Sequence, residues 1–166
     1  MKPPSIPLDR IAALAPACLR LTVPKSYGDA NGHMNVRWFV ALFDDAGDAV
    51  YERLRLTPEY RRQHGITTFD LEHHTHFLSE VVPGDSAAVY VRFVGHSAKR
   101  FHYVMFMVNE TRGALAATFE CVTTFVDLRS RRSAAMPPDI LTGIADWVAR
   151  DSRRDWAAPL SGAMRS

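Results

Sequence analysis

The chain has 166 residues, of which 47% are hydrophobic and 23% are charged, and its formal net charge is +2 at pH 7. This length suffices for one domain with a sizeable hydrophobic core, and the composition is that of an ordinary globular protein. So small a net charge argues against nucleic-acid binding, and no apolar run approaches the roughly 20 residues of a membrane-spanning helix.

The amino-terminal part is expected to contain a loose arm, with a short helical turn around residues 9–14, and then one strand. Residues 11–19 are the best candidate for a signal peptide, but they contain Pro16 and lack a strongly basic lead. We therefore expect a cytoplasmic protein in which Cys18 and Cys121 are reduced core residues, since two cysteines are too few for a disulfide framework. The residues after Cys18 alternate between apolar and polar, as in a half-buried strand that ends at Pro24.

The stretch that follows combines a polar loop with a long helix. Apolar residues recur at steps of three and four and so share one helical face: Val36, Phe39, Val40, Phe43, Ala46, Gly47, Val50 and Leu54. A stripe this wide predicts a helix that lies on a broad apolar surface, most simply a sheet. The loop at residues 28–35 brings Asp29, Asn31, His33 and Asn35 to the amino end of that helix, where unpaired N–H groups suit a developing oxyanion. The alternative is a loop whose Asp and Asn residues only cap the helix.

The rest of the chain changes from helix to strands. A short helix is expected to start at Thr57-Pro58 and to stop at Gly65. Four extended segments then follow one another through tight turns, at residues 66–82, 87–94, 100–109 and 114–128. Tight turns make neighbouring strands antiparallel, and one long helix must cover a face of their sheet, which predicts an α+β architecture. A last helix is expected from about residue 138 to 150, followed by a tail that frays from Asp151 onward.

Two motifs in these elements carry a resemblance to a family. The loop Asp29-Ala30-Asn31-Gly32-His33-Met34-Asn35 is similar to the Asp-x-Asn-x-His-x-Asn motif of hotdog-fold thioesterases that act on acyl-CoA or acyl carrier protein. Asp29 with Gly32 also fits the shorter Asp-x-x-Gly motif of the 4-hydroxybenzoyl-CoA thioesterase branch. The segment from Glu72 to Glu80 resembles the Glu-x-His-x-x-(aromatic)-x-x-Glu segment of thioesterases associated with carnitine and betaine breakdown. The resemblance covers roughly residues 17–138.

The resemblance implies a single domain over residues 1–166, an α+β hotdog fold in which an antiparallel sheet wraps around one long central helix. It also implies hydrolysis of an acyl-CoA thioester to a free acid and CoA, without a cofactor. Asp29 is then expected to activate water or to attack the thioester carbon itself. Backbone N–H groups near Gly32 and His33 would hold the thioester oxygen, and the missing Cβ of Gly32 would let the backbone approach the substrate closely.

The other expected site residues have two interpretations each. Asn31 and His33 would orient Asp29 or bind the carbonyl, whereas Asn35 would steady the loop or merely cap the helix. Glu80 would be a second carboxylate, acting as a base or holding water, and is otherwise a solvated strand end. Which carboxylate is the principal one, and whether it acts as base or nucleophile, stays open.

Candidate substrate-binding residues lie on the long strand and at the start of the helix. On an ideal strand Glu72, His74 and Glu80 point the same way, and Phe77 occupies a position where Tyr is expected. Trp38 stands where Tyr is common and is expected to reshape the acyl pocket. Aromatic rings and carboxylates suit a trimethylammonium group, so a short polar or betaine- or carnitine-like acyl group is our best expectation. The alternative is that the aromatic residues are plain core and the pocket takes medium acyl chains.

Several further interpretations concern ligands and partners. His74 and His76 form a His-x-His pair that can bind zinc, but the resemblance implies no metal. Lys99 and Arg100, or the cluster of arginines at residues 129–132, could meet the phosphates of CoA. A single sheet over one helix leaves edges and an apolar flank exposed, which predicts a homodimer or a dimer of dimers without a nucleic-acid or membrane partner. The rival functions are a hotdog hydratase or dehydratase, and a non-catalytic acyl-CoA-binding protein.

Overall fold

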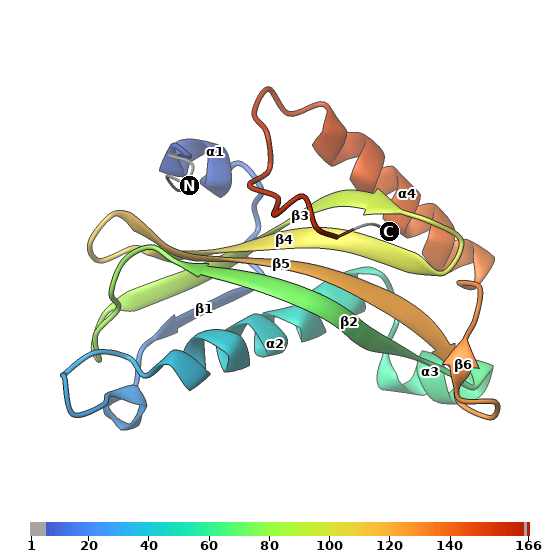
Figure 1. Cartoon of the computed structure of the whole chain (residues 1–166), viewed down its shortest axis with the longest axis horizontal. Helices are drawn as coiled ribbons and strands as arrows, with labels where there is room; N and C mark the ends of the chain where they lie inside the picture. The colour runs from blue at the N-terminus through green and yellow to red at the C-terminus, as the bar shows by residue number, and fades with distance from the viewer. Residues whose placement is uncertain (1–5, 165) are drawn as a thin grey trace. The chain divides into compact units, whose positions relative to one another are not determined.

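The computed structural model describes residues 6–164 and residue 166 (Figure 1). They fall into two compact units, each assembled from three segments of the chain. The first unit takes its described residues from Met1–Val50, Thr75–Val91 and Met105–Phe119. The second consists of Tyr51–His74, Arg92–Val104 and Glu120–Ser166. The expected single-domain organisation stays a prediction.

The helices and strands follow the predicted order along the chain. The helices are α1 (Leu8–Ala12), η1 (Lys25–Tyr27, a 3-10 helix), α2 (Val36–Arg53), α3 (Pro58–His64) and α4 (Pro138–Ser152). The strands are β1 (Leu19–Thr22), β2 (Ile66–Phe77), β3 (Ser86–His96), β4 (Arg100–Asn109), β5 (Ala114–Asp127) and β6 (Arg132–Ser133). Only η1 and the short β6 have no counterpart among the predicted elements.

The described strands form one six-stranded sheet (Figure 1). Its order is β1-β3-β4-β5-β2, with β6 beside β5, and β1 runs antiparallel to β3 with Leu19 opposite Val89. Most residues of β3, β4 and β5 are buried in unbroken runs, which means that both faces of these central strands are covered. The order leaves β2 at an edge of the sheet. The predicted α+β architecture is confirmed.

The end of β2 differs from the prediction in a way that affects the site. The strand ends at Phe77 rather than near residue 82. The N–H groups of Leu78 and Ser79 both donate to the carbonyl oxygen of Ala116, at 2.8 and 3.1 Å, so the alternation of a regular ladder stops there. The expectation that Glu80 shares a strand face with Glu72 is therefore wrong, because Glu80 lies beyond the strand.

Helix α2 has the predicted length, but its buried face is rotated from the predicted stripe. Its buried residues are Phe39, Leu42, Phe43, Ala46 and Val50. Val36 and Val40 are 57% and 38% exposed, although both belong to the predicted apolar stripe. Within the first unit, Phe43 stacks on Phe119 of β5 with ring centroids 5.0 Å apart, and this contact holds the helix against the sheet.

The boundaries of α3 are those that local sequence signals predict. The Thr57 hydroxyl accepts a hydrogen bond from the N–H of Tyr60, and Pro58 is the first helical residue. Gly65 ends the helix in the left-handed conformation, with φ of 62°. These local interactions explain why α3 was predictable without knowledge of its tertiary contacts.

The described part of the tail expected to fray, residues 151–164, is anchored by hydrogen bonds, contrary to the prediction. Within the second unit, the Asp151 carboxylate is fully buried and accepts the N–H of Phe93 at 2.9 Å. Arg92 donates to the carbonyl oxygen of Trp156 at 2.7 Å, and the N–H of Ser161 donates to Glu120 at 2.6 Å. Polar anchors in the sheet therefore hold a segment whose composition suggested a frayed end.

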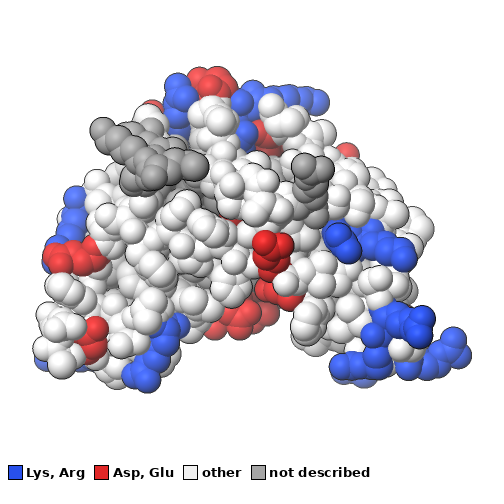
Figure 2. Space-filling view, in the orientation of Figure 1, with Lys and Arg blue, Asp and Glu red and all other residues white. Residues whose placement is uncertain are grey.

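Two surface properties of the described residues bear on partners. None of their helices is both long and apolar enough to cross a membrane. Figure 2 shows Lys and Arg side chains gathered over the turn between β5 and β6, where Arg129, Arg131 and Arg132 are all exposed. This turn belongs to the second unit.

Candidate active site

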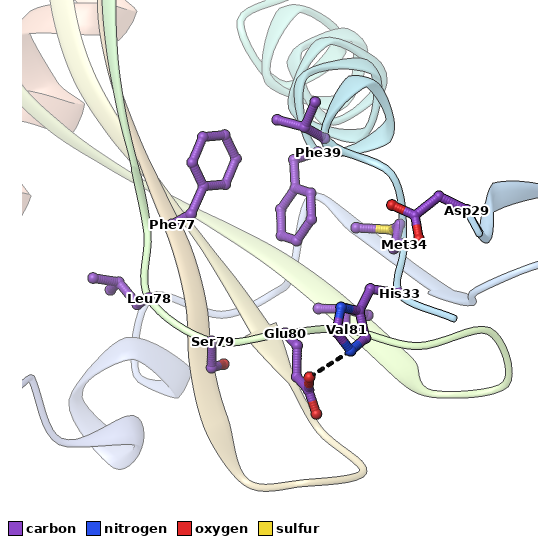
Figure 3. Close-up of a pocket in the computed structure, with 10 residues that line it drawn as sticks. Asp29, His33, Met34, Phe39, Phe77, Leu78, Ser79, Glu80 and Val81 are labelled. Atoms are coloured by element: carbon purple, nitrogen blue, oxygen red, sulfur yellow. Dashed lines mark ion pairs between the residues drawn. The ribbon is translucent and has the colours of Figure 1, made fainter. Parts of the chain in front are cut away.

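A pocket of about 440 Å³ lies in the first unit, where the polar loop meets the start of α2 (Figure 3). Its lining comes from two stretches of the chain: Asp29, His33, Met34, Val36 and Phe39 from the first, and Phe77, Leu78, Ser79, Glu80 and Val81 from the second. The fold thus brings together the ends of the two motifs that the sequence singled out.

The conformation of the loop fixes Asp29 at the pocket. The backbone N–H of Asp29 donates to the carbonyl oxygen of His33, and the N–H of Gly32 donates to the carbonyl oxygen of Asp29, at 2.9 and 3.0 Å. The Asp29 carboxylate accepts the N–H of Asn31 at 2.8 Å, so the loop itself orients this half-buried side chain. Gly32 has φ of 78°, and a Cβ there would meet no atom within 4 Å. This positive φ favours glycine at position 32, and the close approach of a substrate to its backbone stays a prediction.

Two further hydrogen bonds join the loop to its surroundings. The N–H of Met34 donates to the carbonyl oxygen of Val81 at 2.7 Å, which ties the loop to the segment after β2. The side-chain oxygen of Asn35 accepts the N–H of Arg37 at 3.2 Å, as a capping residue does at the start of a helix. Asn35 thus contacts the helix backbone and is not among the residues that line the pocket.

Three charged or ionisable side chains follow one another at the polar end of the pocket, two of them in its lining and the third behind Glu80. Nε2 of His33 lies 2.8 Å from Oε2 of Glu80, and both side chains are about half exposed (Figure 3). The other carboxylate oxygen, Oε1, accepts a hydrogen bond from Nη1 of Arg112 at 2.5 Å. This bond to Glu80 is the main reason why the pKa of Arg112 is raised above its ordinary value. Sequence reasoning missed Arg112, which lies 32 residues from Glu80 in a turn without a motif.

The opposite end of the pocket is apolar and open. The rings of Phe39 and Phe77 meet edge to face, with centroids 5.3 Å apart and an interplanar angle of 85° (Figure 3). Phe77 and Val36 are 50% and 57% exposed. Val36 is also the first residue of α2, and the first N–H groups of a helix have no acceptor within the helix. The pocket therefore combines an apolar wall with a helix amino end that can hold a carbonyl oxygen.

Other predicted site residues lie elsewhere. Trp38 stacks on Tyr27 with ring centroids 3.8 Å apart, and it is not among the residues that line the pocket. Glu72 and His74 are exposed on the part of β2 that belongs to the second unit, and neither lines this pocket. Of Trp38, Phe77, Glu72 and Glu80, the aromatic and acidic candidates for holding a cationic acyl group, Phe77 and Glu80 line this pocket. No cluster of three or more His, Cys, Asp or Glu side chains that could hold a metal occurs within residues 6–164 and 166.

Comparisons with known proteins identify the family. Residues 23–144, well over half of the chain, match the family model of the thioesterase-like superfamily. This chain belongs to that superfamily. This chain is 30% identical over 116 residues to a betainyl-CoA thioesterase of Pseudomonas aeruginosa. The match spans 70% of this chain and 73% of that protein.

Two further relatives extend this comparison. An L-carnitine dehydrogenase/betainyl-CoA thioesterase of Agrobacterium fabrum is 32% identical over 116 residues, but these span 70% of this chain and only 24% of that protein. The match to this chain therefore spans about a quarter of the length of the Agrobacterium relative. A hypothetical protein of Staphylococcus aureus, solved in complex with CoA, superposes with a TM-score of 0.81 at 28% identity, over 89% of this chain and 93% of that one. The hotdog fold expected from the sequence is confirmed by this likeness.

Proposed function

We propose that this protein is an acyl-CoA thioesterase, which hydrolyses a thioester to a free acid and CoA. The observation that carries the proposal is the pocket at the amino end of α2, where Asp29 and the His33–Glu80 pair lie beside an apolar wall. Membership of the thioesterase-like superfamily supports the reaction type. A pocket with two carboxylates at a helix amino end has the groups that thioester hydrolysis requires.

In the proposed reaction, water attacks the thioester carbon and gives a proton to the Asp29 carboxylate. The carbonyl oxygen becomes an oxyanion, which N–H groups at the amino end of α2 stabilise. The carbon–sulfur bond then breaks, and the departing CoA thiolate recovers the proton from Asp29. Glu80, oriented toward His33, is the second carboxylate and holds the attacking water. Attack by Asp29 itself is the variant of this mechanism in which water enters only in a second step.

A free-thiol assay across a panel of acyl-CoA substrates tests this function directly. We expect thiol release that depends on the enzyme and saturates with substrate, unaffected by chelators. Tight binding of acyl-CoA without thiol release would overturn the proposal in favour of a binding protein. Addition or removal of water on the acyl chain, with the thioester intact, would instead indicate a hydratase or dehydratase.

We further propose that the acyl group is short and polar, with a betaine- or carnitine-like group favoured. The names of the Pseudomonas and Agrobacterium relatives support this class. The ring of Phe77 and the carboxylate of Glu80 in one pocket also support it, because a quaternary ammonium group binds aromatic faces and nearby carboxylates.

The test is the ratio of kcat/KM for betainyl-CoA to kcat/KM for a neutral acyl-CoA of similar size. We expect a ratio above one in the wild type that falls toward one in Phe77→Leu, which keeps the apolar volume but removes the ring. A loss of preference in Glu72→Gln instead would indicate that the cationic group binds at Glu72, as the sequence motif suggested. Equal rates for both substrates in the wild type, or a steady gain with chain length, would exclude a cationic acyl group.

We also propose a homodimer or a dimer of dimers, in which a second copy of the chain covers the edge of β2. This strand is 12 residues long and has no neighbour on its outer side among the described strands. Its side chains Phe69 and Leu71 are 64% and 46% exposed, an unusual amount of apolar surface for an unpaired edge. Light scattering should give about two or four times 18.6 kDa. A stable species of 18.6 kDa at micromolar concentration would contradict it.

Finally, we propose a cytoplasmic location. Cys18 and Cys121, the two cysteines of the sequence, both lie in the described part of the chain, and neither takes part in a disulfide. Burial raises the pKa of the Cys121 thiol to about 12, so this side chain behaves as a small apolar group. Thiols of this kind fit a reducing compartment. Fractionation of the native source, followed by the thiol-release assay, would test the location.

A further inference from the structure

The Glu80 side chain is oriented by contacts from two other residues. The residue lies beyond the end of β2, and its side chain is 46% exposed. A glutamate side chain in that setting can adopt several rotamers, so the groups that contact its carboxylate decide which one it takes. The carboxylate is nevertheless contacted on both oxygens, by His33 on Oε2 and by Arg112 on Oε1.

Arg112 is itself held from two sides within the first unit. Its backbone N–H donates to the side-chain oxygen of Asn109 at 3.1 Å, which fixes the turn between β4 and β5. Its Nε lies 3.2 Å from Oδ2 of Asp85, whose side chain is only 8% exposed. The guanidinium therefore forms a planar bridge from a buried carboxylate to the pocket carboxylate, a geometry for which arginine is better suited than lysine.

Asp85 is a firm anchor for this bridge because it stays charged. Its carboxylate accepts the amide of Asn109 at 2.6 Å and the N–H of Val82 at 3.1 Å. Burial is the largest single influence on the pKa of Asp85 and would raise it. The hydrogen bonds from Val82 and Asn109, with the charge of Arg112, together hold that pKa below its ordinary value. A carboxylate ionised and held in this way fixes the guanidinium at its other end.

We propose that Arg112 is a positioning residue of this enzyme, which holds the Glu80 carboxylate toward His33 at the pocket and so sets the rate of turnover. The inference rests on the proposed thioesterase function and deepens it. Arg112 is not among the residues that line the pocket, so it acts through Glu80 rather than on the substrate. Its loss therefore lowers kcat and leaves KM for acyl-CoA largely unchanged.

The test is a double-mutant cycle between Arg112→Gln and Glu80→Gln, measured by free-thiol release. We expect Arg112→Gln to lower kcat about fivefold to tenfold, with KM within about twofold of the wild type. In the Glu80→Gln background the same substitution should cost nothing more, because the side chain through which it acts no longer carries charge. Arg112→Lys should recover part of the rate, since lysine keeps the positive charge but lacks the planar guanidinium that bridges two carboxylates.

The same turn offers a matched control. Arg20 forms an exposed ion pair with Glu110, with Nη2 2.9 Å from Oε1, and neither residue lines the pocket. Arg20→Gln removes an arginine–glutamate pair of the same kind and is expected to leave kcat unchanged. A loss of rate in Arg20→Gln equal to that in Arg112→Gln would overturn the proposal, because it would reflect only disturbance of the turn.

Three other results decide against Arg112 as a positioning residue. One is a kcat of Arg112→Gln equal to that of the wild type. Another is an equal loss of kcat from Arg112→Gln in the wild-type and Glu80→Gln backgrounds. A rise in KM at constant kcat would instead indicate that Arg112 binds the phosphates of CoA. If the wild type releases no thiol, the proposed function itself fails, and the positioning role is then read from the NMR signals of the His33 imidazole. These should shift in Arg112→Gln and not in Arg20→Gln, and unchanged signals in both would overturn the role.

Discussion

Two histidine–glutamate pairs of this protein have nearly the same geometry in opposite surroundings. In the first unit, His33 Nε2 lies 2.8 Å from a Glu80 oxygen, and the side chains are 49% and 46% exposed. In the second unit, His102 Nε2 lies 2.9 Å from a Glu120 oxygen, and the side chains are 8% and 3% exposed. Residue type and distance alone would assign the two pairs the same role.

The surroundings of the Glu80 and Glu120 carboxylates indicate different roles for the two pairs. The second oxygen of Glu120 accepts the N–H of Ser161 at 2.6 Å, so this buried carboxylate is occupied on both sides by the protein itself. Glu80 is also contacted on both oxygens, but it lines an open pocket together with Asp29. A substrate can therefore reach the first pair, whereas the second pair satisfies polar groups in the interior. Access to solvent and substrate, rather than residue composition, therefore distinguishes a candidate site from a structural pair.

The largest effect should come from the pocket. Asp29→Asn removes the carboxylate that takes the proton from water, so kcat should fall by about a hundredfold or more. The loop should survive, because the amide oxygen of Asn can still accept the N–H of Asn31. Thiol-release kinetics and circular dichroism check both expectations. Wild-type rates in a folded Asp29→Asn variant would remove Asp29 from the chemistry.

The buried pair should show the opposite behaviour. Glu120→Gln leaves His102 in the interior without its carboxylate, and we expect the free energy of unfolding to fall by about 2 kcal/mol. Turnover per folded molecule should stay within about twofold of the wild type, because no substrate reaches this pair. Urea denaturation and thiol release on the same sample measure the two quantities. Unchanged stability with reduced turnover would reverse the roles assigned to the two pairs.

A smaller effect is expected when the exposed pair is broken in the same way. Glu80→Gln should lower kcat about tenfold, less than Asp29→Asn, if Glu80 holds water while Asp29 takes the proton. The free energy of unfolding of Glu80→Gln should hardly differ from that of the wild type, because ion pairs between exposed side chains contribute little to stability. The matched substitutions at Glu80 and Glu120 thus form a direct test of the comparison. A greater loss of rate at Glu80 than at Asp29 would make Glu80 the principal carboxylate.

The smallest effect should be on the pH dependence of stability, through Asp85, the buried carboxylate that contacts Arg112. Because the pKa of Asp85 is lower in the folded state than its ordinary value, the unfolded chain binds a proton there more readily. The stability from Asp85 is therefore fully present above about pH 4–5 and is lost as the pH falls through the folded value. Asp85→Asn should be less stable at neutral pH and should lose less on acidification, as urea denaturation between about pH 2.5 and 6 will measure. Parallel curves for the two proteins would contradict this role.

Much of the fold and part of the site could be predicted because the signals are local. The apolar period of α2, the Thr57 cap and the left-handed Gly65 act within one or two turns of the chain, so the sequence is sufficient for them. The Asp29 loop is also local, since its own N–H groups orient the carboxylate. The end of β2 was mispredicted because the carbonyl oxygen of Ala116 on β5, far along the chain, decides where the ladder stops.

The order of elements, the fold class and the loop that presents Asp29 could be predicted from short-range signals, because hydrogen bonds and apolar periods within a few residues specify them. Tertiary structure alone decided which polar side chains meet. It joined Glu80 to Arg112, left Trp38 on Tyr27 outside the pocket, and buried Asp151 in a tail expected to fray. Such contacts join residues far apart in the chain, and their partners and exposure depend on how segments pack, which no short-range pattern encodes.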